Sequence, residues 1–230
     1  MTAEQKKAIT SKSGKYVYVI LSSTPYKLSA FIRKVTGFHY NHVSLCMDMN
    51  TDKKMFPMYS YARYYKNAPL YAGFVKESIR RYKHMGKYSD FIIFAIPVEK
   101  KKYDAMKKYL ETLDNAPGGY LYNMLSAACN PFHKKVIIKD SYTCIEFAIE
   151  ILTRFKITDK LDPKKFYSIK DIYDIFRKYT VYKGSSEPFF KHSSVGNDTF
   201  FVKKSRLDIT LLTVKSNVRL VVKYVKQVLR

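Results

Sequence analysis

Two residues far apart in the chain, Cys144 and His42, carry the side chains that thiol-based catalysis needs. The pattern Thr143-x-x-Glu146 is a capping box, which predicts a helix that begins at Cys144. A thiol there meets the positive end of the helix dipole and unpaired backbone N–H groups. Both favour the thiolate, and the same N–H groups can stabilise an oxyanion. The alternative is a buried cysteine that acts as a small apolar side chain.

His42 lies in a segment whose alternation predicts a strand from Asn41 to Met49. Polar or reactive side chains would share one face of this strand, and apolar side chains the other. The remaining histidines (His39, His84, His133 and His192) fall in loops or polar contexts, where solvent exposure is expected. His42 is therefore our candidate general base, and a half-buried imidazole with a structural hydrogen bond is the alternative.

The sequence offers no second nucleophile pair, metal site or cofactor motif. Cys46 shares a face with His42, but four residues of strand separate them by about 13 Å. Cys129 ends an apolar segment and is expected in the core. No His, Cys, Asp or Glu cluster has metal-ligand spacing, and neither a nucleotide-binding glycine loop nor a GxSxG motif occurs. We therefore expect no metal and no cofactor.

Composition points to anionic partners and a reducing compartment. The 230 residues include 42 Lys+Arg and 19 Asp+Glu, a net charge of +23. Such a field attracts nucleic acid, anionic lipid or acidic polymers, although solvated lysines would give the same count. The three cysteines have no paired spacing, residues 1–15 lack an apolar signal core, and no apolar run approaches about 20 residues. We expect a cytoplasmic protein, with delivery by a phage or by Sec-independent export as the alternative.

Periodicity predicts an α+β fold with an antiparallel sheet packed against helices. Strands are expected at 15–22, 41–49, 55–61, 91–96, 136–138 and 200–204, and helices from Ser23 to Gly37 and at 99–113, 121–128, 143–155, 169–179 and 211–229. Residues 62–89 are rich in Tyr and Lys with little periodicity, so a long loop with short pieces of structure is expected there. The chain divides into a polar arm (1–14), a main domain (15–184) and a basic extension (185–230).

The order of these segments resembles the circularly permuted NlpC/P60 superfamily of papain-like thiol hydrolases and acyltransferases. The resemblance covers about residues 15–184 and depends on a strand, a helix, Gly-x-x-x-x-His-Val-Ser and a late Cys at a helix start. The matching segments are Tyr16–Leu21, Phe31–Gly37, Tyr40–Ser44, Met58–Tyr61, Gly73–Val75, Tyr142–Phe147 and 162–184.

This resemblance implies a papain-like fold in which Cys144 attacks an acyl carbonyl and His42 is the base. The substrate would be an amide or ester in a peptide, a lipid or a peptidoglycan-like polymer. Many members carry a Glu on the strand after the His strand, to orient the imidazole. Here Met58–Tyr61 has no carboxylate, and Ser60 occupies the matching position, so Ser60 is the expected third member.

The extension from 185 to 230 lies outside the resemblance. It holds nine Lys and Arg against three acidic residues, and its apolar residues recur at helical spacing. A basic amphipathic helix is typical of binding to an anionic membrane surface or a partner, and charge alone also allows nucleic acid. The alternative is a helix packed on the domain. A rival function follows: a catalytically silent relative that binds an anionic polymer or membrane through its basic face.

Overall fold

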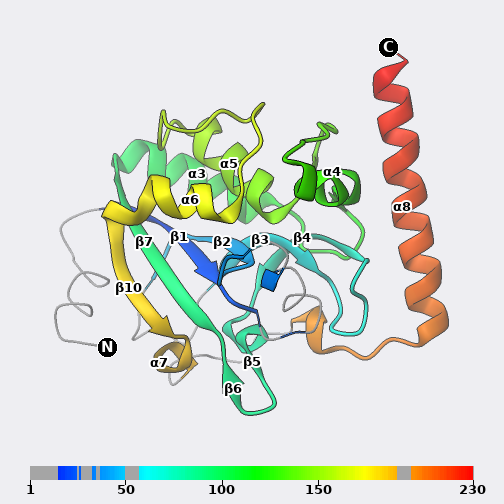
Figure 1. The fold of residues 1–230 in the computed structure, drawn as a ribbon, viewed down its shortest axis with the longest axis horizontal. Helices are drawn as coiled ribbons and strands as arrows, with labels where there is room; N and C mark the ends of the chain where they lie inside the picture. Colours follow the sequence, from blue (N-terminus) through cyan, green and yellow to red (C-terminus); the bar gives the residue numbers. More distant parts are fainter. Residues whose placement is uncertain are drawn as a thin grey trace.

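A six-stranded antiparallel sheet in the order β10-β7-β1-β2-β3-β4 forms the centre of the fold (Figure 1). The computed structural model describes residues 15–24, 26, 33–34, 37–49, 57–190 and 198–229. The strands are β1 (Lys15–Ser22), β2 (His42–Cys46), β3 (Met58–Arg63), β4 (Ala72–Glu77), β7 (Asp90–Val98) and β10 (Thr180–Ser185). With the helices packed on it, this sheet confirms the predicted α+β class.

Three helices cover one face of the sheet and form the larger core. They are α3 (Lys100–Thr112), α5 (Cys144–Arg154) and α6 (Ile169–Phe176), which lie together on one side of the sheet in Figure 1. Val17, Val19 and Leu21 point to this face because alternate residues of a strand share a side. The apolar stripe of α5 packs against β2 and β3, so its first residue is held near the start of β2.

The opposite face is covered by shorter elements. Tyr18, Ile20 and Phe91 point to this face and pack with residues of η1 (Ile79–Tyr82) and α7 (Glu187–Phe190). A small hairpin, β5 (Lys83–His84) with β6 (Lys87–Tyr88), connects η1 to β7. Both faces of the sheet are therefore buried, which explains why β1 and β7 are almost continuously apolar.

A second, two-stranded pairing prepares the start of α5. The parallel strands β8 (Leu121–Tyr122) and β9 (Ser141–Tyr142) bring two distant segments together directly before Cys144. Between them lie α4 (Met124–Cys129) and η2 (Asn130–Phe132). Asn123 caps α4 through its side chain and donates its backbone N–H to Tyr142 O (3.0 Å). The chain that leads into α5 is thus fixed by a neighbouring element.

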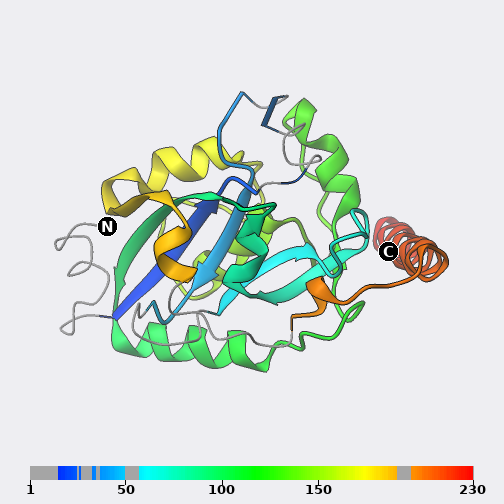
Figure 2. The same cartoon turned by 90° about the horizontal axis from the view of Figure 1, so that it is seen from below.

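The remaining elements close the chain. They are η3 (Arg177–Tyr179), η4 (Thr199–Phe201) and the 23-residue helix α8 (Arg206–Val228). Figures 1 and 2 place α8 at one edge of the molecule, beside the end of the sheet that carries β4. No helix among the described residues combines the length and apolarity that crossing a membrane requires.

Several predicted elements differ from those observed. The 62–89 segment is more regular than the predicted loop with short pieces of structure, because it contains the end of β3, all of β4, which is a strand of the central sheet, η1 and the β5–β6 hairpin. Residues 200–204 do not form the predicted strand: η4 occupies 199–201 instead. At 136–138 the structure has a single bridge from Ile138 to Ser141 rather than a strand. Most of the helix expected between Ser23 and Gly37 lies outside the described residues.

Candidate active site

Cys144 is the first residue of α5, and its local sequence explains this position. Thr143 Oγ1 accepts a hydrogen bond from Glu146 N (3.3 Å), and the Glu146 carboxylate accepts one from Thr143 N (2.8 Å). The predicted capping box is therefore confirmed. Ser126 Oγ donates a further hydrogen bond to Glu146 (2.5 Å), which ties the start of α5 to α4. The buried thiol thus lies where the helix dipole is positive and backbone N–H groups lack helical partners.

His42 is the first residue of β2, and its side chain is buried. Its Nε2 lies 2.8 Å from Glu77 Oε1 on β4. The Cys144 side chain is close enough to act on the imidazole both as a hydrogen-bond partner and as a charge. The fold therefore brings together the two residues that the sequence pointed to, although 101 residues (positions 43 to 143) lie between them in the chain. It also adds a carboxylate to the pair.

The ionisation of His42 and Glu77 is coupled. Burial alone would lower the pKa of His42, but the Glu77 charge and hydrogen bonds to Cys144 and Glu77 raise that pKa to about 10. Burial would likewise raise the pKa of Glu77, yet the His42 charge and the hydrogen bond to it lower that pKa. Both shifts favour a buried imidazolium–carboxylate pair at neutral pH.

A second layer of hydroxyl groups holds Glu77 in place. Tyr82 Oη donates a short hydrogen bond to Glu77 Oε2, and Ser44 Oγ lies 3.5 Å from Oε1. Ser44 Oγ and Tyr82 Oη are themselves 3.2 Å apart. Burial, followed by the charge of Glu77, raises the pKa of Tyr82 well above its ordinary value, so its proton stays on the phenol and is donated. Glu77 therefore presents a fixed oxygen to His42.

Ser60 does not have the contact expected of the third member. Its hydroxyl is buried and donates to Val43 O (2.7 Å), a backbone group of β2. The imidazole is bound instead by Glu77 of β4, one strand further along the sheet than β3. The assignment of Ser60 as the orienting residue is corrected accordingly: Ser60 fastens β2 to β3 beside His42.

Glu77 was missed because its strand has a weak sequence signal. Gly73 and the charged pair Lys76-Glu77 break the apolar alternation of β4, and Gly is unfavourable inside a strand. The structure explains Gly73: a Cβ there would collide with Tyr120 O and the Tyr64 hydroxyl. The sequence does contain one signal that points to Glu77: this residue lies two positions after Gly73–Val75, a segment that carries part of the family resemblance.

The other cysteines, and the histidines that the structure describes, do not belong to this site. Cys46 is fully buried, burial raises its pKa, and its thiol donates to Asp48 O (3.4 Å). Cys129 is half-buried at the end of α4. His39 forms an exposed pair with Asp90 (2.8 Å), and His192 lies outside the described residues. Tyr122 is adjacent to the thiol: burial, then the charges of Cys144 and Glu146, raise the pKa of Tyr122.

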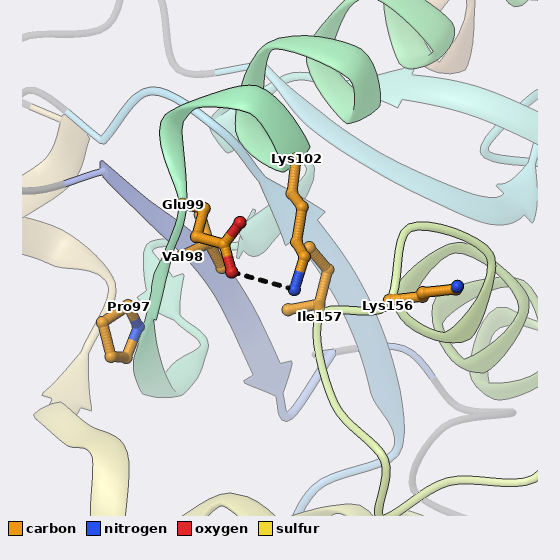
Figure 3. Close-up of a pocket in the computed structure, with 6 residues that line it drawn as sticks. All are labelled: Pro97, Val98, Glu99, Lys102, Lys156 and Ile157. Carbon is orange, nitrogen blue, oxygen red and sulfur yellow. Dashed lines mark ion pairs between the residues drawn. The ribbon is translucent and has the colours of Figure 1, made fainter.

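A pocket of about 380 Å³ lies elsewhere (Figure 3). It is lined by Pro97, Val98, Glu99, Lys102, Lys156 and Ile157. Pro97 pairs with Tyr16 at the start of β1, whereas His42 pairs with Ser22 at the end of β1. The pocket therefore belongs to the opposite end of the sheet from Cys144, and its exposed Glu99–Lys102 ion pair (3.3 Å) offers no nucleophile. Within the described ranges, no cluster of three His, Cys, Asp or Glu side chains could hold a metal ion.

Searches of protein-family models, curated proteins and solved structures find no match to this chain. The chemistry of the site therefore rests on its own geometry. A thiol at a helix N-terminus, an imidazole in contact with it and a buried carboxylate behind the imidazole form the arrangement that activates a sulfur nucleophile.

Proposed function

We propose that this protein is a cysteine-dependent hydrolase or acyltransferase of the permuted NlpC/P60 type, acting on an amide or ester bond. The observation that carries the proposal is the position of His42, held by Glu77 at Nε2 (2.8 Å) and near enough to Cys144 for that side chain to raise the pKa of the imidazole. A structural histidine needs only one partner. A histidine between a carboxylate and a helix-terminal thiol has the geometry of a nucleophile–base–orienter set.

The reaction would proceed in two acyl-transfer steps. The Cys144 thiolate attacks the carbonyl carbon, forming a C–S bond, and the oxyanion faces the free N–H groups at the start of α5. Collapse breaks the bond to the leaving amine or alkoxide, which takes the proton from the His42 imidazolium and leaves a thioester. A water, alcohol or amine then gives its proton to His42 and attacks the thioester. Its collapse releases the acid, ester or amide and returns the thiolate–imidazolium pair.

Glu77 would act as the positioning residue in this sequence. Its carboxylate fixes the ring orientation and stabilises the positive imidazole that precedes each proton transfer. The resemblance to the permuted NlpC/P60 superfamily supports peptides, lipids and peptidoglycan-like polymers as substrate classes. The antiparallel sheet with helices on one face agrees with that family at the level of fold class.

Alkylation of the three cysteines tests the proposal. Iodoacetamide at pH 7.5 should modify Cys144 faster than Cys129 or the buried Cys46, as followed by peptide mass spectrometry. His42→Ala should slow modification of Cys144 at least tenfold. His39→Ala is the matched control, because it removes an exposed His–carboxylate pair outside the site. Equal and slow modification of all three cysteines would exclude the enzyme.

A second candidate function rests on charge. The net charge is +23, and the described part of the extension exposes Lys203, Lys204, Arg206, Lys215 and Lys226. A catalytically silent protein could use this basic surface to bind nucleic acid or an anionic membrane. Such binding should weaken steeply between 50 and 200 mM salt, by on the order of a thousandfold for six or more phosphate contacts. Fluorescence anisotropy with labelled single-stranded RNA or anionic vesicles checks it, and no binding at low salt excludes it.

A further inference from the structure

Helix α8 has two apolar faces, and the inner one is already used. Ile209 and Leu212 pack against the cluster around Tyr64 and Tyr71, and Leu220 is buried with Leu121. Polar contacts continue along the same side of the helix. Arg219 donates to Gly118 O (3.0 Å), and Gln227 bonds both Ile137 O and Lys139 N (2.9 Å each). The inner face therefore fastens α8 to the domain over most of its length.

The outer face carries a second apolar stripe with a strict repeat. Its residues follow one another at alternating steps of four and three, and all are 45–69 % exposed. They are Leu207, Leu211, Val214, Val218, Val221, Val225 and Val228, here called the outer seam. At 1.5 Å per residue the seam is about 30 Å long, and on a helix roughly 10 Å wide it reaches the size of the largest apolar patches on monomers. Figures 1 and 2 show α8 at the molecular edge with one side turned away from the domain.

The spacing of the outer seam is the repeat of a helix–helix interface. Alternating steps of four and three over three heptads keep one stripe facing a partner helix that supercoils with it. A helix that lies in a bilayer interface needs a broad apolar face, typically with Trp, Phe or Leu, and gains nothing from a strict 3.5-residue period. The seam instead consists of five valines and two leucines, with no aromatic side chain.

We propose that the outer seam pairs with the outer seam of a second copy of this chain, in antiparallel orientation about a two-fold axis at Val218. With this register the two helices overlap over residues 208–228. Leu211 is level with Val225 of the other copy, and Val218 is level with itself. Leu207 and Val214 pack beside Val228 and Val221 of the other copy, which are one residue from the same level. A two-fold pairing of this kind is isologous and closes after two copies.

The charges beside the outer seam permit this pairing in spite of the strongly basic composition. In the antiparallel register Lys215 faces Val222 of the other copy, and Asp208 faces Leu229. On the other flank Thr210 is near Tyr224 of the other copy, and Asn217 is near Asn217 of the other copy. Among the remaining cations of the second half of α8, Arg219 and Lys223 lie towards the domain, since Arg219 donates to Gly118 O and Lys223 is near Asp140 (3.9 Å). Lys226 is exposed beside the seam residue Val225. Like charges therefore do not meet across the seam.

Sedimentation equilibrium of the full chain tests the pairing. The chain of 27.0 kDa should sediment at twice that mass at micromolar concentration. Val218→Asp combined with Val225→Asp should weaken the dimer at least a hundredfold, and Val202→Asp, another exposed valine but outside α8, should leave it unchanged. Because both seam valines are exposed, the monomeric variant should retain the wild-type rate of Cys144 alkylation. A wild type that stays monomeric overturns the proposal, and so does a double variant that stays dimeric. A wild type that is monomeric in solution and pellets with phosphatidylserine vesicles would show that the seam binds a membrane, which also overturns the proposal.

Disulfide trapping tests the orientation, in a background that carries both Cys129→Ala and Cys144→Ala, because Cys144 is the proposed reactive thiol and the third cysteine, Cys46, is buried. Leu207→Cys and Val228→Cys chains should form a mixed disulfide dimer when combined. Neither chain alone should form one, since each position faces the other in the antiparallel register. Efficient dimers of Leu207→Cys with itself would indicate parallel helices and contradict the proposed pairing. Neither experiment depends on the chemistry proposed for Cys144.

Discussion

Glu77→Gln should separate the electrostatic role of the carboxylate from its role in packing. Gln has the same shape and keeps a hydrogen bond to His42, but it removes the negative charge that stabilises the buried imidazolium. With Glu77 present, the pKa of His42 is raised to about 10. Without it, burial should return this pKa to about 6.5 or lower. The protonated fraction of His42 at pH 8 would then fall from nearly complete to about 3 %, a loss of roughly thirtyfold.

The rate of Cys144 alkylation reports this change, because the imidazolium stabilises the thiolate. At pH 8 the variant should react about thirtyfold more slowly than the wild type. At pH 5.5 a larger fraction of His42 is protonated in the variant than at pH 8, so the loss of rate should be clearly smaller at pH 5.5. NMR titration of the His42 ring measures the pKa directly.

Two controls sharpen the test. Glu99→Gln removes an equal charge from the exposed ion pair with Lys102, so it should change neither the rate of Cys144 alkylation nor the titration of His42. Ser60→Ala should leave the His42 titration unchanged, since its hydroxyl bonds Val43 O. A Glu77→Gln protein that reacts at the wild-type rate at pH 8 refutes the reasoning. An equal loss at pH 5.5 and pH 8 refutes it too, because the effect would then be structural.

Further predictions concern stability and pH. Tyr82→Phe removes a hydrogen-bond donor from Glu77 and should lower the free energy of unfolding in urea by about 1–3 kcal/mol. Because that hydrogen bond lowers the pKa of Glu77, the variant should also begin to lose Cys144 alkylation at a higher pH than the wild type as the solution is acidified. Asp198→Asn breaks the buried ion pair with Arg81 and should cost about 3–5 kcal/mol; a cost under 1 kcal/mol contradicts the buried pair. Gly73→Ala should cost about 3 kcal/mol through its clash, whereas Gly119→Ala, with ordinary contacts, should be nearly neutral in the same assay. Because the pKa of His42 is raised in the folded state, protonation of His42 stabilises the fold fully below about pH 6.5, and this stabilisation is lost as the pH approaches 10. The free energy of unfolding of the wild type should therefore fall between these pH values. In His42→Gln this fall should be absent.

Local signals in the sequence pointed to Cys144 and His42, which the fold brings close together. The start of α5 depends on four consecutive residues, so its capping box can be recognised without knowledge of the fold. The face of His42 follows from the alternation of β2, which is equally local. The α+β class follows from the apolar runs of β1 and β7 and from the periodic helices.

The partner of His42 could not be found in the same way. It depends on strand order, since β4 lies two strands from β2, and no local pattern specifies that order. The weak alternation of Ala72–Glu77 hid the strand itself. The two faces of α8 were similarly inseparable in sequence: apolar residues recur on both sides, and only packing against Tyr64 and Leu121 shows which side faces the domain.

An acyl-enzyme on Cys144 is the most direct test of the proposed chemistry. The protein is mixed with p-nitrophenyl acetate at pH 7.5, and p-nitrophenol release and intact mass are followed together. The proposed mechanism predicts a burst of about one equivalent of p-nitrophenol and a single acetyl group that maps to Cys144. The burst should be absent in Cys144→Ser and at least tenfold slower in Glu77→Gln. Acetylation spread over lysines, with no burst and no modification of Cys144, would contradict the account.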